Sequence, residues 1–300
     1  MRILLTGGTG LIGRALCKHW QRQGHELFVW SRRPDQVAAL CSGARGVAQL
    51  QQLESLPPID AVVNLAGAPI ADRPWTKARR ELLWRSRVDL TRTLVEWLGR
   101  QRVPPRVLLS GSATGWYGDG GEQPLDEHSA AVQPDFGSRL CAAWEQEADK
   151  ARQWGMRVAL LRTAPVLAPQ GGVLGRLLPP FRLGLGGRLG SGAQWMPWIH
   201  IDDQVGLIDH LLQRDDCSGV FNACAPHQVR NAEFTRTLAR TLHRPAVLPA
   251  PAWALRLALG EMSVLLLGGQ RLSPRRTQAA GFVWRQPQLR PALAQLLHST

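Results

Sequence analysis

A glycine-rich turn near the start of the chain constrains the fold more than any other feature. Residues 2–6 predict a short buried strand, and residues 14–23 predict an amphipathic helix. Gly8, Gly10 and Gly13 lie in the turn between them. A phosphate-binding turn needs this order, because glycines let the backbone approach a pyrophosphate and the helix N-terminus offers free N–H groups. The alternative, a glycine-rich turn without a ligand, is less favoured because a strand and a helix flank the turn.

The length and the charge limit the function classes. Three hundred residues allow one large α/β unit, or a nucleotide-binding lobe with a smaller partner lobe. The net charge of +13 raises the question of a nucleic acid or an anionic membrane as partner. The basic residues are scattered, however, and form no block of five or six. We therefore expect no nucleic-acid partner, and keep nucleic-acid binding as the weakest hypothesis.

The cysteines and apolar segments predict a cytoplasmic protein. The five cysteines show no C-x-x-C spacing and are odd in number, as expected of buried reduced thiols. The N-terminal apolar run stops at Gly7 and lacks the shape of a signal peptide. Residues 252–267 are too short and too charged to span a bilayer, so we expect no membrane association. His200, Asp202 and Asp203 form no metal-ligand spacing, and we expect no metal.

The end of the second expected strand predicts the cofactor. Residues 26–30 predict this strand, and Ser31, Arg32 and Arg33 follow it without an acidic residue. An NAD site places a carboxylate here for the ribose hydroxyls, whereas an NADP site places arginine against the 2′-phosphate. We therefore predict NADP(H), bound in part by Ser31 and Arg32. The alternative is an exposed basic loop without a ligand.

The remaining periodicity predicts an α/β fold with a Rossmann-type doubly wound parallel sheet. Further strands are expected at residues 59–65, 106–109, 157–161 and 219–225. Helices are expected at residues 79–98, 134–154, 231–242 and 253–267. Strands alternating with helices indicate a parallel sheet with right-handed crossovers. A smaller, mainly helical C-terminal lobe should cover the cleft.

Several motifs in order give the chain a family resemblance. They are residues 6–13 (TGGTGLIG), 64–67 (NLAG), 110–118 (SGSATGWYG), 161–163 (LRT), 198–203 (WIHIDD) and a C-terminal segment from 249 to 297. The chain resembles an atypical extended short-chain dehydrogenase/reductase of the branch called the epimerase family, which is NAD-dependent epimerase/dehydratase-like. The resemblance implies a Rossmann domain at residues 1–165 plus about 199–228. It implies a substrate or cap lobe at about 166–198 plus 229–300, in which 249–298 is the branch's own small domain.

The expected cofactor contacts come from the residues and from the resemblance. In the turn and the first helix they are Gly7, Thr9, Gly10, Leu11, Ile12 and Gly13. After the third strand, Leu65, Ala66 and Gly67 are small or apolar residues that let a flat adenine or ribose approach the backbone. The resemblance adds Arg87, Ser110, Arg162 and Thr163, the last two at the nicotinamide end.

The catalytic expectation departs from the family's usual pattern. The reductase mechanism of that family uses a tyrosine acid/base and a lysine four residues later, but Phe136 and Leu140 stand at these positions. Ser112 matches the family's active-site serine or threonine, and its hydroxyl suits a substrate oxygen. Tyr117, the only tyrosine, is a proton donor if it faces the cleft. The alternative for Ser112 is a loop serine bonded to its own backbone, and the alternative for Tyr117 is a ring that only packs.

Two functions remain in view. One is an NADP(H)-binding atypical short-chain dehydrogenase/reductase, an oxidoreductase or epimerase-like enzyme on a small substrate that uses Ser112 and Tyr117 in place of the missing dyad. The other is a non-catalytic NADPH-binding sensor or regulator, which the loss of both dyad residues favours. The sequence specifies neither the substrate, nor the direction of reaction, nor the oligomeric state.

Overall fold

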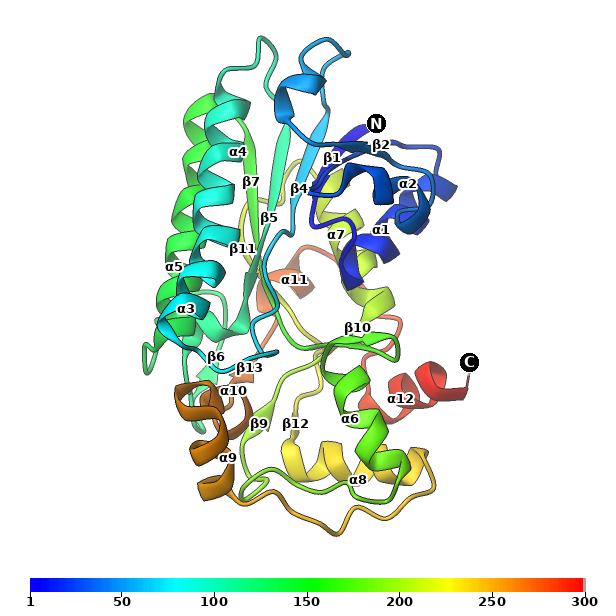
Figure 1. Ribbon diagram of the computed structural model, residues 1–300, viewed down its shortest axis with the longest axis vertical. Helices are drawn as coiled ribbons and strands as arrows, with labels where there is room; N and C mark the ends of the chain where they lie inside the picture. Colours follow the sequence, from blue (N-terminus) through cyan, green and yellow to red (C-terminus); the bar gives the residue numbers. More distant parts are fainter. Residues whose placement is uncertain (299–300) are drawn as a thin grey trace.

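A seven-stranded parallel sheet forms the centre of the chain in the computed structural model, which describes residues 1–298 (Figure 1). Residues 299 and 300 of the expected second lobe lie outside the described residues. The strands are β1 (Arg2–Thr6), β2 (Glu26–Trp30), β3 (Arg45–Val47), β4 (Ala61–Asn64), β5 (Val107–Ala113), β7 (Arg157–Thr163) and β11 (Gly219–Ala223). Their order across the sheet is β11-β7-β5-β4-β1-β2-β3. The predicted doubly wound parallel sheet is confirmed.

The strand order reverses direction between β1 and β4. From β1 the chain first moves outward through β2 and β3, and then returns to place β4 on the other side of β1. The loops after β1 and β4 therefore diverge and leave a crevice at the carboxyl ends of the strands, where doubly wound sheets bind their ligands. Thr6 and Asn64 end the two strands as register partners and mark the floor of this crevice.

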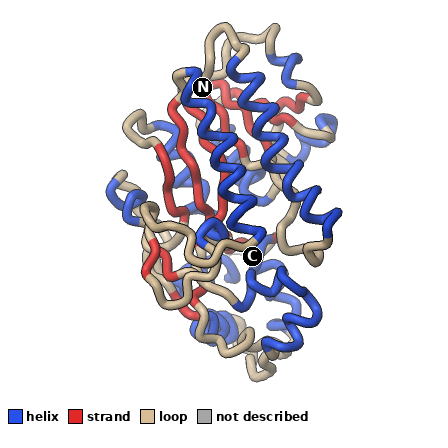
Figure 2. The backbone as a smooth tube through the Cα atoms, turned by 90° about the vertical axis from the view of Figure 1, so that its left-hand side faces the viewer, coloured by secondary structure: helices blue, strands red, loops and turns tan. Residues whose placement is uncertain are grey.

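Helices cover both faces of the sheet (Figures 1 and 2). Helices α1 (Leu11–Arg22) and α7 (Ile201–Gln213) pack on one face, and α4 (Leu90–Gly99) and α5 (Phe136–Asp149) on the other. The alternation of β1 shows how one strand serves two cores: Ile3 and Leu5 enter the α1/α7 core, whereas Leu4 enters the α4/α5 core. Burial on both faces explains the nearly continuous apolar runs of the central strands.

A second, smaller assembly lies beyond the carboxyl ends of the strands, at the foot of Figure 1. It contains α6 (Gly172–Arg182), α8 (Asn231–Thr241), α9 (Ala252–Leu259), α10 (Val264–Leu267), α12 (Leu289–His298) and the antiparallel pair β9 (Trp195–Met196) and β12 (Val229–Arg230). Its apolar centre includes Phe181, Trp198 and Phe234. The helical character predicted for the C-terminal region is confirmed, and the domain boundaries stay a prediction.

The C-terminal segment also returns to the main sheet. β13 (Arg271–Leu272) pairs with β6 (Pro124–Leu125), and α11 (Arg275–Ala279) packs against β11. One further pair, β8 (Val166–Ala168) with β10 (Ile199–His200), leads from the sheet toward α6. These short pairs join the two parts of the molecule at several points.

Three local features differ from the predicted elements. The single helix expected at residues 79–98 is α3 (Lys77–Trp84), a π-helical turn (Arg85–Asp89) and α4. The helix expected at 253–267 is interrupted at Gly260, whose φ of 56° leaves the helical region. β3 was not predicted, because three residues are too few to show periodicity. Among the described residues, no helix combines the length and the apolar character that crossing a membrane requires.

Candidate functional site

The glycine turn forms a tight cradle between β1 and α1. Gly7 has a φ of 71°, and a Cβ there would lie 2.7 Å from the backbone carbonyl carbon of Leu65. A Cβ on Gly13 would lie 2.6 Å from Gly8 Cα, so only glycine lets α1 start this close to the turn. Helix α1 has Gly10 as its N-cap and no side-chain cap, which leaves its first N–H groups available to an anion. Thr9, Leu11 and Ile12 lie along the same turn, all half-buried.

A buried polar network supports the floor of the crevice. The Thr6 hydroxyl donates to Asn64 Oδ1 at 2.7 Å and accepts from the Ala66 backbone N–H at 3.0 Å. The Asn64 amide donates to the hydroxyls of Thr91 at 2.7 Å and Ser110 at 3.1 Å. These bonds fix the loop after β4 against the loop after β1. Ser110 is fully buried and belongs to this network, so it supports the site from below.

The end of β2 carries the residues predicted to select the cofactor. Arg32 is exposed, whereas Ser31 is half-buried and its Oγ accepts the Arg33 backbone N–H at 3.1 Å. Val29, the second-last residue of β2, lies against Gly8, so the end of β2 is adjacent to the glycine turn. The expected contact of the Arg32 guanidinium with a ribose 2′-phosphate stays a prediction.

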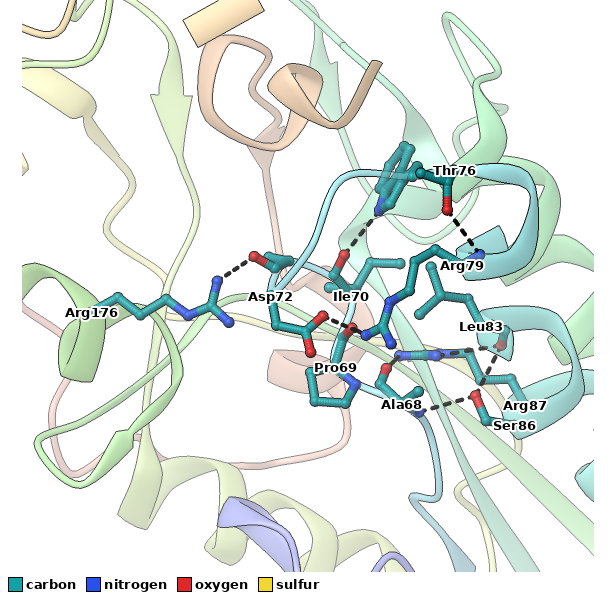
Figure 3. A network of polar contacts seen from close by, with 12 residues as sticks. Ala68, Pro69, Ile70, Asp72, Thr76, Arg79, Leu83, Ser86, Arg87 and Arg176 are labelled. Atoms are coloured by element: carbon teal, nitrogen blue, oxygen red, sulfur yellow. Dashed lines mark hydrogen bonds and ion pairs between the residues drawn. The ribbon is translucent and has the colours of Figure 1, made fainter. Parts of the chain in front are cut away.

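The loop after β4 is held by arginines from two sides (Figure 3). Arg87 comes from the π-helical turn, and its Nη2 donates to the Ala68 carbonyl at 3.0 Å. Arg79 pairs with Asp72, and Arg176 of α6 reaches the carbonyl of Ala71. Burial lowers the pKa of the Arg87 guanidinium, which lies beneath Gly67 and positions this loop. The expected cofactor contact by Arg87 stays a prediction.

Ser112 belongs to a buried cluster at the carboxyl end of β5. Its hydroxyl donates to Glu145 Oε1 at 2.6 Å. Arg162, the register partner of Ser112 on β7, donates to both oxygens of the same carboxylate at 2.9 Å. The side chains of Glu145 and Arg162 are 9% and 4% exposed, so the pair is almost completely removed from water. Cys141, one helical turn before Glu145, is also buried, and burial raises the pKa of its thiol to about 11.

Aromatic rings enclose the other side of Arg162. The guanidinium carbon lies 3.4 Å from the ring centre of Trp116 and 5.0 Å from that of Tyr117. Nη1 of Arg162 is buried without a hydrogen-bond partner among residues 1–298. Cation–π contacts of this kind stabilise a guanidinium that water cannot reach. Thr163 ends the same strand and is half-buried.

Tyr117 is not placed as a proton donor for the cleft. The side chain is fully buried, and its hydroxyl donates to Asn222 Oδ1 at 2.8 Å and lies 3.0 Å from the Asp126 carbonyl oxygen. Burial raises the pKa of this phenol to about 12. The structure therefore favours the packing interpretation of Tyr117, and the mechanism proposed below does not use this residue.

A cavity lies beyond the ends of β5 and β7, on the side of the second assembly, and its lining does not include Ser112, Glu145 or Arg162. Thr114 and Gly115, which follow β5, and Pro165, which follows β7, form the wall nearest the sheet. The opposite walls come from α6, β9, α8 and α10. The cavity thus lies at the carboxyl edge of the sheet, where a substrate of a doubly wound enzyme is expected.

Comparisons with known proteins identify the family. Residues 3–224 match the NAD dependent epimerase/dehydratase family, and residues 250–296 match a domain of unknown function, DUF1731. This chain belongs to the NAD dependent epimerase/dehydratase family. The predicted resemblance to its epimerase branch is confirmed, because full-length relatives carry the description "epimerase family protein".

Three relatives show how far the similarity of this family member extends. Epimerase family protein YfhF of Bacillus subtilis is 34% identical and covers 99% of this chain and 98% of its own length. The crystal structure of human epimerase family protein SDR39U1 with NADPH is 35% identical, covers 100% of both chains and has a TM-score of 0.91. A nucleoside-diphosphate sugar epimerase of Corynebacterium glutamicum is 30% identical, with a TM-score of 0.77 over 99% of this chain and 58% of that one.

Sequence reasoning missed Glu145. A glutamate in a helix is usually solvated, but Glu145 joins Ser112 to Arg162. A signal was present: Glu145 lies beside Trp144 and nine residues after Phe136, among the buried positions of α5. An acidic residue at a core position of a helix requires a partner, and Arg162 is the buried cation that provides one.

Proposed function

We propose that this chain is an NADP(H)-dependent oxidoreductase acting on a small substrate with a carbonyl or hydroxyl group. One observation carries the proposal: a serine hydroxyl, held 2.6 Å from a buried carboxylate, lies near the carboxyl end of β5, two residues before Thr114, which lines a cavity. The family membership and the NADPH in the human relative's structure support the choice of cofactor.

The residues present fit a dinucleotide. The uncapped N-terminus of α1, together with the glycine cradle in which Gly13 leaves no room for a Cβ, suits a pyrophosphate. The exposed guanidinium of Arg32 suits a 2′-phosphate, because the two groups carry opposite charges. NADPH, when bound, supplies a hydride for a carbonyl carbon, and NADP⁺ accepts one from an alcohol carbon.

Ser112 is the group we place against the substrate oxygen. In the oxidation direction, the alcohol proton passes to Ser112 Oγ while the Ser112 proton passes to Glu145, and the hydride leaves the same carbon. In the reduction direction the same two proton transfers run in reverse. Arg162 is a positioning residue, since it holds Glu145 by two hydrogen bonds and does not contact the substrate oxygen.

The test is turnover with the purified chain. NADPH is incubated with a panel of carbonyl compounds, and oxidation is followed by the loss of NADPH absorbance. We expect oxidation that disappears in Ser112→Ala, while this variant keeps its affinity for NADPH. Turnover that survives Ser112→Ala unchanged contradicts the role of Ser112.

A non-catalytic NADPH-binding regulator is the second candidate. Phe136 and Leu140 favour it, because these buried apolar residues stand at the positions of the family's tyrosine and lysine. Tight binding of NADPH without turnover on a broad panel would support this candidate over the enzyme. For either candidate we propose a cytoplasmic location, since all five cysteines are free and buried, as suits a reducing compartment.

A further inference from the structure

Positive charge is missing from the cavity, although the chain contains 36 lysine and arginine residues. Among the described residues that line the cavity there is no lysine, arginine or histidine, and the one charged residue is Asp135. The diphosphate of a nucleotide sugar requires cations or free helix N-termini. The charge pattern of the lining therefore disfavours this class of ligand.

At two of the helices that begin at the cavity, α5 and α8, N-terminal N–H groups are already occupied. At α5 the Asp135 carboxylate accepts the Ser138 backbone N–H at 2.8 Å and acts as the N-cap. At α8 the backbone N–H groups of Asn231 and Ala232 both donate at 2.9 Å, to the carbonyls of Gln194 and Gly192. Neither helix leaves these donors to an anion, and the Asp135 carboxylate would repel one.

Two cations, Arg230 and Arg271, lie over Trp195 without belonging to the lining, and Arg230 is neutralised by an ion pair. Arg230 stacks on Trp195, a wall residue, with its guanidinium carbon 4.5 Å from the ring centre. Its two terminal nitrogens donate to the two carboxylate oxygens of Glu122 at 2.8 Å each. Arg230 thus closes the outside of the wall and is not free to bind a phosphate.

The walls themselves are apolar and aromatic. Phe181 of α6, Trp195 of β9 and Phe234 of α8 come from three separate elements, and Leu177 and Leu266 lie among them. Thr114 and Thr235 add hydroxyl groups to this lining. The other polar lining residues besides Asp135 are Gln194, Asn231 and Gln270, whose side-chain amides already bond to backbone atoms of the chain. A few polar groups in a mainly apolar cavity suit a ligand with one or two polar groups on a hydrophobic body.

From these observations we infer that the cavity binds an uncharged, largely apolar ketone, aldehyde or alcohol, not a nucleotide sugar. The inference rests on the proposed function for the reaction: the hydride of NADPH joins the carbonyl carbon, a proton joins the oxygen, and NADP⁺ and the alcohol result. This ligand class differs from the nucleoside-diphosphate sugar after which the Corynebacterium glutamicum relative is named.

The test measures binding separately from turnover. The chain saturated with NADP⁺ is titrated in a calorimeter with acetophenone, 2-decanone and UDP-glucuronic acid. We expect saturable binding of at least one apolar compound and none of UDP-glucuronic acid. Binding of UDP-glucuronic acid, or of no apolar compound, overturns the inference.

A pair of variants locates the binding. Leu177→Asp places a carboxylate in the cavity, and we expect it to lower the affinity for the apolar ligand by about tenfold or more. Leu183→Asp, just after α6, is the matched control, because that side chain is 74% exposed and does not line the cavity. Equal effects of the two variants, or a lost affinity for NADP⁺ in Leu177→Asp alone, contradict the assignment of the cavity.

The two proposals fail in different ways. Binding of an apolar compound without NADPH oxidation removes the oxidoreductase function and leaves the ligand class intact. NADPH oxidation driven by a nucleotide sugar keeps the oxidoreductase function and removes the ligand class.

Discussion

Ser112 and Glu145 lie 33 residues apart in the chain, yet the Ser112 hydroxyl donates to Glu145 Oε1 at 2.6 Å. The contact joins the end of β5 to the middle of α5, five residues beyond Leu140, the position of the family's lysine. Because Arg162 binds the same carboxylate through two nitrogens, the serine, the acid and the arginine form one unit.

Glu145→Gln should destabilise the fold strongly. Removing one partner of a buried ion pair leaves Arg162 uncompensated, which costs about 3–5 kcal/mol of the free energy of unfolding. Urea unfolding measures this cost. The matched control is Glu96→Gln, an exposed residue of α4, which should change stability by less than about 0.5 kcal/mol. Similar small effects at both positions would show that Glu145 is not part of a buried pair.

Arg32→Asp should discriminate between the two nicotinamide cofactors. Loss of the charged hydrogen bonds to a 2′-phosphate should weaken the binding of NADPH by about 1.5–3 kcal/mol more than the binding of NADH. The control is Arg102→Asp, which makes the same charge change in an exposed loop before β5, at the amino ends of the strands. Fluorescence titration with both cofactors gives the comparison, and an equal loss for NADPH and NADH excludes Arg32 as the selector.

Gly13→Ala should abolish dinucleotide binding and destabilise the chain. The added Cβ would lie 2.6 Å from Gly8 Cα, which forces α1 away from the turn at a cost of about 1–3 kcal/mol. Gly206→Ala is the opposite case: the glycine lies inside α7, and its added Cβ meets Phe282 at 3.6 Å, an ordinary contact. That variant should be neutral or more stable by up to about 1 kcal/mol. Thermal unfolding and NADPH binding of both variants test the pair, and normal binding by Gly13→Ala would refute the cradle.

Tyr117 should ionise only in strongly alkaline solution, because burial raises the pKa of its phenol to about 12 from the ordinary 10. Below about pH 10 the phenol is neutral in both states, so it adds no pH dependence. As the pH rises from about 10 to about 12, the unfolded chain loses this proton first, and stability should fall by about 2–3 kcal/mol. Tyr117 is the only tyrosine, so phenolate absorbance reports it directly. A midpoint at the ordinary pKa would show that the hydroxyl reaches solvent.

Local patterns were enough to predict the sheet and the cradle. The strands around Leu4, Val62 and Leu108 are apolar on both faces, and the turn from Gly7 to Gly13 carries its own geometric requirement. These signals lie within a few neighbouring residues, where sequence reasoning is strongest.

The catalytic cluster could not be predicted in the same way. In the sequence Glu145 resembles a surface residue, and only the fold shows that β7 places Arg162 next to it. For Tyr117 the sequence leaves a proton donor and a packing ring open, and the contact with Asn222 of β11 favours the packing ring. Both outcomes depend on contacts between residues far apart in the chain. The lining of the cavity, in which Asp135 is the one charged residue among the described residues, is equally non-local, since it is assembled from five or more elements.

The central claim, that the chain binds NADPH in the cradle of β1 and α1, is tested most directly by calorimetric titration of the purified chain with NADPH and with NADH. We predict saturable binding at one site per chain, tighter for NADPH by about 10- to 150-fold, the ratio that 1.5–3 kcal/mol represents. No heat with either cofactor, or tighter binding of NADH, would contradict the account.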